Sequence, residues 1–209
     1  MRRSTLPLLA AGAVLFAGCT ESATDPTAPA PDAPAEQRSP APGMDPIAQI
    51  AIERGFSELV EALAYVDTEL DAGLIPLFLE GTDQFTVFAP TNEAFDDLYA
   101  LLSVVLGAPV ADVTDLPAEV VLDVLFYHVA EGRRGANSVV PKRNVKTITP
   151  LLGESFAVRT DLTIEDGLTA LEVRDDAQIV AADFTASNGI IHVIDQVIVP
   201  PSVVAALTQ

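Results

Sequence analysis

Few side chains in this sequence are able to do acid–base or nucleophilic chemistry. The chain has two histidines, His128 and His192, and one cysteine, Cys19. His192 precedes Asp195 by three residues, which suggests an imidazole base with a carboxylate that orients it. Residues three apart on a strand point to opposite faces, so this pair meets only if a β-bulge intervenes. His128 lies on the apolar stripe of an expected helix. We therefore expect both imidazoles to be buried and hydrogen-bonded rather than catalytic.

Residues 161–172, DLTIEDGLTALE, are the one segment with the spacing of a calcium loop. Acidic or hydroxyl groups stand at its first, third, fifth and twelfth positions, but Asp166 replaces the sixth-position glycine. The alternative, which we favour, is a hairpin whose turn is Glu165-Asp166-Gly167. A nucleophile elbow, a zinc-protease motif, a phosphate loop and a Gly-rich dinucleotide turn are all missing from the sequence. We expect no catalytic residue, no metal site and no cofactor.

The N-terminus has the pattern of a secretory signal peptide, residues 1–18. Two arginines precede an apolar stretch of twelve residues that ends in the small pair Ala17-Gly18. This stretch is too short to remain as a membrane span. Cys19 follows at once, and the segment LFAGC resembles a bacterial lipobox, in which the cysteine is acylated and becomes the new N-terminus. The alternative is ordinary cleavage that leaves a free thiol. A lipid on Cys19 would place the protein outside the cytoplasm, and Thr20 favours the outer membrane if the source is Gram-negative.

Residues 19–44 have the composition of a tether. This segment contains six prolines, and its only large apolar residue is Met44. It buries too little apolar surface to offset the entropy of ordering, so we expect a disordered, Pro/Ala-rich linker between the lipid and a domain spanning residues 45–209.

The charge balance excludes two classes of partner. The whole chain has a net charge of -19, and removal of the signal peptide leaves nine basic and thirty acidic residues, or -21. A surface this acidic does not release counterions from nucleic-acid phosphates, and it is repelled by anionic lipid headgroups. We therefore expect no nucleic-acid partner, and membrane contact through the N-terminal lipid alone. The single cysteine also excludes an intrachain disulfide.

The domain begins with helical patterns and ends with strand patterns. We expect a helix after Asp45-Pro46 that ends at Arg54, with Asp45 as its N-cap, and another from Ser57 to about Leu70 with Ser57 as its N-cap. Further helices should follow Thr91 and run from about Pro117 to Val129. The expected strands are Phe85–Ala89, Val145–Ile148, Ser155–Arg159, Leu162–Ile164, Leu168–Val173, Gln178–Ala182 and Ile190–Val199. Helices followed by a run of strands indicate an α+β fold.

Two segments have residue patterns that predict a specific local structure. In TVFAPTNEAF, residues 86–95, a strand turns through Pro90 into a helix that Thr91 caps, and Phe95 returns apolar surface to the core. In NGIIHVIDQVIVPP, residues 188–201, Asn188-Gly189 is a turn that permits positive φ, and a strand that is apolar on both faces follows. That strand should be central and covered on both sides.

Together with FYHV, residues 126–129, these two segments resemble the signature motifs of the fasciclin-like domain. The matched positions, all expected to be structural, are Thr86, Phe88, Pro90, Thr91, Phe95, Tyr127, His128, Asn188, Gly189, His192 and Asp195. The resemblance covers about Pro46 to Leu207. It implies a wedge of two β-sheets with several packed helices, the N-terminal half mainly helical and the C-terminal half mainly strands.

The resemblance also implies a function: a binding or adhesion module at the cell surface that contacts another protein or a matrix polysaccharide. We expect the domain itself to be monomeric. Two alternatives remain open from the residues alone. One is a periplasmic enzyme whose site the sequence does not reveal, and the other is a purely structural component of the envelope. The absence of any nucleophile–base or metal-ligand spacing favours binding.

Overall fold

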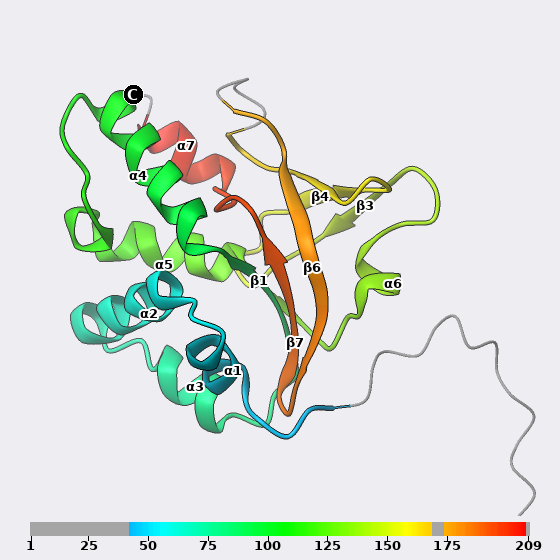
Figure 1. The fold of residues 1–209 in the computed structure, drawn as a ribbon. Helices are drawn as coiled ribbons and strands as arrows, with labels where there is room; N and C mark the ends of the chain where they lie inside the picture. Colours follow the sequence, from blue (N-terminus) through cyan, green and yellow to red (C-terminus); the bar gives the residue numbers. More distant parts are fainter. Residues whose placement is uncertain (1–41, 169–173, 208–209) are drawn as a thin grey trace, which may run out of the picture. The chain divides into compact units, whose positions relative to one another are not determined.

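The computed structural model describes residues 42–168 and 174–207, drawn in colour in Figure 1. The expected signal peptide, Cys19 and the tether up to residue 41 lie outside the described residues. The helices are α1 (Ile47–Glu53), α2 (Ser57–Leu70), α3 (Leu74–Glu80), α4 (Asn92–Leu106), the 3-10 helix η2 (Val113–Asp115), α5 (Ala118–Tyr127), α6 (Ala136–Val139) and α7 (Pro201–Leu207). The strands are β1 (Phe85–Pro90), β2 (Val129–Glu131), β3 (Val145–Ile148), β4 (Phe156–Arg159), β5 (Thr163–Glu165), β6 (Ala177–Ala186) and β7 (Gly189–Ile194).

The strands confirm the α+β expectation and follow the order β2-β1-β7-β6-β5-β4-β3. The central pair, β1 and β7, is parallel, while each of the other neighbouring pairs is antiparallel. β6 belongs to two ladders, because it pairs with β7 over most of its length and with β5 at Ala177 and Gln178. The two sheets of the expected wedge are therefore joined through β6. In Figure 1 most of the helices lie on one side of β1 and β7, and β3 and β4 lie on the other.

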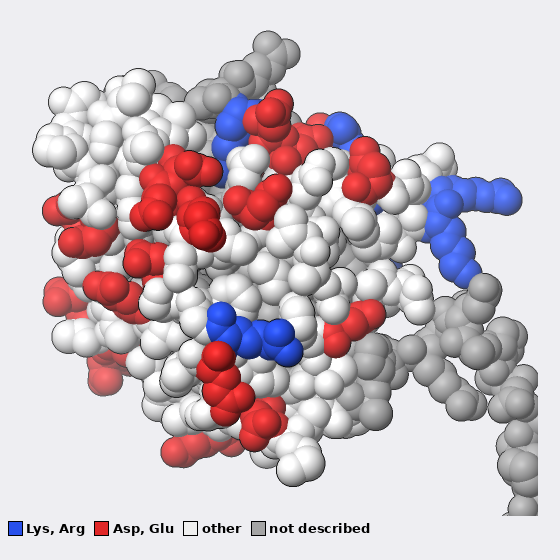
Figure 2. All heavy atoms as spheres, in the orientation of Figure 1, with Lys and Arg blue, Asp and Glu red and all other residues white. Residues whose placement is uncertain are grey.

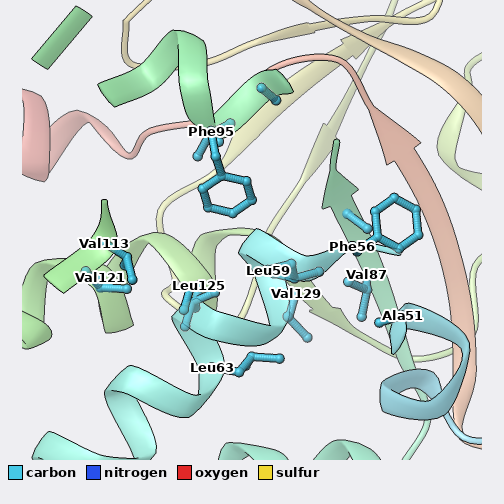
Figure 3. Close-up of a cluster of buried hydrophobic side chains, with 14 of the residues drawn as sticks. Ala51, Phe56, Leu59, Leu63, Val87, Phe95, Val113, Val121, Leu125 and Val129 are labelled. Atoms are coloured by element: carbon cyan, nitrogen blue, oxygen red, sulfur yellow. The ribbon is translucent and has the colours of Figure 1, made fainter. Parts of the chain in front are cut away.

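Apolar side chains cover both faces of β7, as predicted, and both faces of β1 as well. In β1, Phe85, Val87 and Ala89 face the large core under the helices, and Phe88 faces a second core. Figure 3 shows part of the large core, with residues of α2, α5 and η2 converging near Phe95 of α4. In the second core the ring of Phe156 meets Phe88 and Tyr127 edge-on, at centroid distances of 5.2 and 5.4 Å. Such aromatic pairs add to the stabilisation that burial alone provides.

Two of the predicted helix caps are wrong. α1 has Pro46 at its N-cap position, and the carbonyl of Asp45 instead accepts a hydrogen bond from Ser187 N–H at 2.8 Å. Ser57 lies inside α2, where Asn92 Oδ1 accepts a hydrogen bond from Glu58 N–H at 3.3 Å. Asn92, from the first turn of α4, thus supplies an acceptor that local sequence does not. The Thr91 cap is confirmed, because its hydroxyl accepts a hydrogen bond from Ala94 N–H at 3.3 Å.

Three predicted elements end earlier than expected or pair differently. The helix from Pro117 stops at Tyr127, and Val129 joins β2 opposite Val87 of β1. The strand expected to run to Val199 stops at Ile194. The predicted hairpin between residues 162–164 and 168–173 is wrong in its pairing, because β4 and β6 occupy both edges of β5. Residues 169–173 lie outside the described residues.

The chain enters the domain along the end of β6. Gly43 N–H donates to Ala186 O at 3.1 Å, two residues before the Asp45 carbonyl accepts from Ser187. A Cβ on Gly43 would lie 2.1 Å from Thr185 O, so this close approach requires glycine. Within the described part of the chain, no helix has both the length and the apolar composition needed to cross a membrane.

Candidate functional site

His128 is a buried structural residue, as predicted. It caps α5, its Nδ1 lies 2.7 Å from Val124 O, and its Nε2 lies 3.1 Å from the backbone nitrogen of Ile198. Because a carbonyl only accepts and an N–H only donates, Nδ1 carries the proton and Nε2 is the acceptor. Burial lowers the pKa of this imidazole to about 4. The Nδ1 bond lies within α5 and the Nε2 bond joins α5 to the segment after β7, so both ring nitrogens are already hydrogen-bonded.

His192 is also structural, with the opposite tautomer. Its Nε2 donates to Arg134 O at 2.9 Å, and its Nδ1 accepts from Asp183 N–H at 3.4 Å. Asp183 has a φ of 63° and sits at an irregularity in the β6–β7 register, so the bulge turns its N–H toward the imidazole. Burial lowers the pKa of His192. Asp195 is not its partner, since that carboxylate accepts from Gln178 N–H at 2.7 Å.

Thr86, in the first motif, joins β1 to the segment that follows β2. The buried hydroxyl of Thr86 donates to Gly132 O at 2.6 Å and accepts from Arg134 N–H at 2.9 Å. The phenol of Tyr127 donates to Ser155 O at 3.4 Å, and burial raises its pKa. These hydrogen bonds satisfy polar groups that the sheet buries. Thr86 of the first motif and Tyr127 of the FYHV segment therefore hold separate segments of the chain together.

Asn188 does more than the predicted turn requires. Its buried amide accepts from Ile47 N–H at 2.8 Å through Oδ1 and donates to Phe78 O at 2.9 Å through Nδ2, so it joins α1 to α3. The pair does not use the positive φ that its sequence permits, because neither Asn188 nor Gly189 is among the residues with positive φ. Glycine is required there for another reason: a Cβ would lie 2.2 Å from Phe85 O on the neighbouring strand.

The sequence predicts that Asp166 lies in a hairpin turn, and in the structure its side chain is buried. Its Oδ2 forms a 2.6 Å ion pair with Arg174 and accepts from Val199 N–H at 2.8 Å, and its Oδ1 accepts from Leu168 N–H at 3.1 Å. No local pattern indicates this role, because its partners come from segments that only folding brings together. Across residues 42–168 and 174–207, no group of three or more His, Cys, Asp or Glu side chains is placed to hold a metal ion.

The charged surface is the remaining candidate for function, and its charges are segregated. Residues 47–127 contain fifteen acidic residues and one basic residue, whereas residues 132–153 contain five basic and no acidic residues. Figure 2 shows acidic groups over the side where α2, α4 and α5 lie, and basic groups that project beside α6 and β3. Lys142 and Arg143 are exposed in this basic segment. The domain thus presents surfaces of opposite sign, an arrangement that steers and orients charged partners.

Comparisons with known proteins match this domain to one family. The model of the Fasciclin domain matches residues 54–200. Protein sll1483 of Synechocystis sp. is 35% identical over 146 residues, which is 70% of this chain and 68% of that protein. Immunogenic protein MPB70 of Mycobacterium bovis is 28% identical over 197 residues, covering 94% of this chain and 87% of that protein.

Longer proteins contain a similar segment. Transforming growth factor-beta-induced protein ig-h3 of Sus scrofa is 30% identical over 156 residues, which is 73% of this chain but 19% of that protein. A solved domain pair from the insect cell adhesion molecule Fasciclin I aligns with 72% of this chain and 46% of that one, at 15% identity and a TM-score of 0.41. Because the family model spans most of the folded domain and includes both predicted motifs, the chain belongs to the fasciclin domain family.

Proposed function

We propose that this protein is a non-enzymatic binding or adhesion module, displayed outside the cytoplasm on a lipid-anchored tether. The observation that carries the proposal is that the side chains able to do chemistry are hydrogen-bonded to the protein's own backbone. The side chains of His128, His192 and Asn188 form hydrogen bonds to backbone groups, and apart from the bond of His128 to Val124 these backbone groups lie in other segments of the chain. These residues maintain the fold, which leaves the exposed surface for function.

The partner is a protein or a matrix polysaccharide that recognises charge. The acidic side over α2, α4 and α5 favours a basic partner, or an acidic polysaccharide bridged by cations, and the basic segment 132–153 favours an acidic group. Contacts of this kind weaken as salt screens them. The name of one related protein is compatible with display outside the cytoplasm, since it is called an immunogenic protein.

The test is crosslinking on intact cells, followed by a pull-down with the purified protein at low and high salt, with and without calcium. A double variant, K142E/R143E, reverses charge in the basic segment, and D96K/D97K reverses two exposed charges on α4. We expect one variant, and not the other, to reduce capture of the crosslinked partner at least tenfold. Equal capture by both variants at every salt concentration contradicts the proposal, as does turnover of a substrate that a single side-chain change abolishes without unfolding the protein.

A further inference from the structure

A cavity of about 410 Å³ lies among α2, α4, α5 and α7, with η2 beside it. This volume falls in the range of roughly 300–1,000 Å³ that is typical of ligand pockets. Its walls include Leu102 of α4, Val120 and Val124 of α5, and Val203 of α7. Figure 3 shows part of this region, where Phe95 of α4 points toward the core residues of α2 and α5. The cavity is thus wide enough for a small molecule and is lined mainly by hydrocarbon.

The polar residues of the lining already have partners. Tyr99 donates its phenol proton to Glu58 Oε2 at 3.4 Å, and Asp115 Oδ2 accepts from Ala111 N–H at 2.8 Å. His128, as described above, uses both ring nitrogens on the backbone. A ligand with many polar atoms would lose its hydrogen bonds to water on entering the cavity and would regain few from the lining. Its binding would therefore be unfavourable. The lining therefore selects a molecule made mostly of hydrocarbon.

The electrostatics of the lining also discriminate between apolar ligands. Asp115 is the carboxylate among the lining residues, and Glu58 adds a second carboxylate beside the lining phenol of Tyr99, to which it is hydrogen-bonded at 3.4 Å. A fatty-acid carboxylate would be repelled there, whereas an uncharged head group would not. Beside the cavity, the C-terminal turn of α4 exposes Val104 by 80% and Leu106, itself a lining residue, by 42%. This apolar rim gives a hydrocarbon chain a path inward from the surface.

We propose that the cavity binds an uncharged, largely hydrocarbon molecule with a single long chain, such as a long-chain alcohol or a monoacylglycerol. The cavity lies between the helices α2, α4 and α5, over which the acidic surface proposed to contact the partner also lies. The spacing of the lining residues in the sequence predicts a packed core and does not indicate a cavity. Binding there would give the domain a second ligand of a different chemical class.

The test uses the full chain and N-phenyl-1-naphthylamine, an uncharged probe that fluoresces in apolar surroundings. We expect saturable binding, with 1-dodecanol displacing the probe at a concentration at least tenfold lower than laurate. V120W should fill the cavity and weaken probe binding at least tenfold. The matched control V180W adds the same side chain at an exposed position of β6 and should leave binding unchanged. If V120W does not fold, L106W at the rim replaces it.

Four outcomes overturn the proposal. The first is absence of saturable probe binding, and the second is equal binding by V120W and V180W. The third is displacement by laurate as effective as displacement by dodecanol, because the acidic surroundings then do not select the ligand. Sedimentation of the chain at the same concentrations adds a further criterion. If the chain is a dimer and binds the probe only after the dimer dissociates, a second copy of the chain covers the cavity. That result would also overturn the proposal.

Discussion

The imidazole of His128 accepts a hydrogen bond from the backbone N–H of Ile198 at 3.1 Å, across 70 positions of the chain. The same ring donates to Val124 O, so both bonds require the neutral form. Protonation would place an N–H against the Ile198 N–H and a charge in the core. The hydrogen bond therefore makes the stability of the fold depend on pH.

Acid should destabilise the protein through His128. Its pKa falls from 6.5 to about 4 on folding, so its contribution is complete above pH about 6.5 and is lost as the pH falls toward 4. That shift corresponds to about 3 kcal/mol. We expect urea unfolding midpoints at pH 7 and pH 4.5 to differ more for the wild type than for H128Q, whose side chain does not titrate. An equal pH dependence in both proteins would assign the acid sensitivity to other groups.

Replacement of Asn188 should cost more than its place in a turn suggests. N188A leaves Ile47 N–H and Phe78 O without their partner in a buried site. Each unsatisfied group costs about 1–3 kcal/mol, so we expect a loss of about 2–5 kcal/mol in the free energy of unfolding. Asn137, which is exposed in α6, provides the control, and N137A should change stability by less than about 0.5 kcal/mol. Similar losses in the two variants would show that the Asn188 bonds contribute little.

Two glycines should respond differently to alanine. G189A would place a Cβ 2.2 Å from Phe85 O, in the parallel pairing of β1 with β7, and we expect strong destabilisation or loss of folding. Gly55 has a φ of 76° and open space around its Cα, so G55A should cost only the strain of that backbone conformation, about 1 kcal/mol. Thermal unfolding of both variants measures the difference. If G55A proves the more damaging, the strand contact at Gly189 is not the constraint we infer.

The proposed lipid on Cys19 predicts where the protein is found after cell fractionation. If Cys19 is acylated, the wild-type protein should sediment with membranes, and C19S should be released or remain unprocessed. Membrane fractionation and mass spectrometry of the N-terminus measure both outcomes. The fractionation of a variant in the tether, T20A, provides a control that keeps the cysteine. Unchanged membrane partition and normal processing of C19S would contradict acylation at this residue.

The sequence was sufficient to predict a helix, a strand or its buried face where the spacing of apolar residues within that one segment determines it. The alternation of Phe85, Val87 and Ala89 predicted a strand. The spacing of Leu59, Ala62, Leu63, Val66 and Leu70 predicted the apolar face of α2, on which Leu70 is partly buried and the other four are buried. The structure confirms both. The buried, hydrogen-bonded state of His128 and His192 also followed from their apolar neighbours, because a polar ring in an apolar stripe must find backbone partners. The family resemblance rested on the same short, self-contained motifs.

Features that depend on distant partners required the tertiary structure. The sequence shows Asn188 beside a glycine, but only folding brings Ile47 and Phe78 to its amide. Asp166 lies in a turn-like tripeptide, and its burial depends on Arg174 and Val199. The residues around the 410 Å³ cavity come from separate helices whose apolar faces do not close completely against one another. Local spacing determines which face of each helix is apolar, but the space left between those faces depends on how all the helices pack.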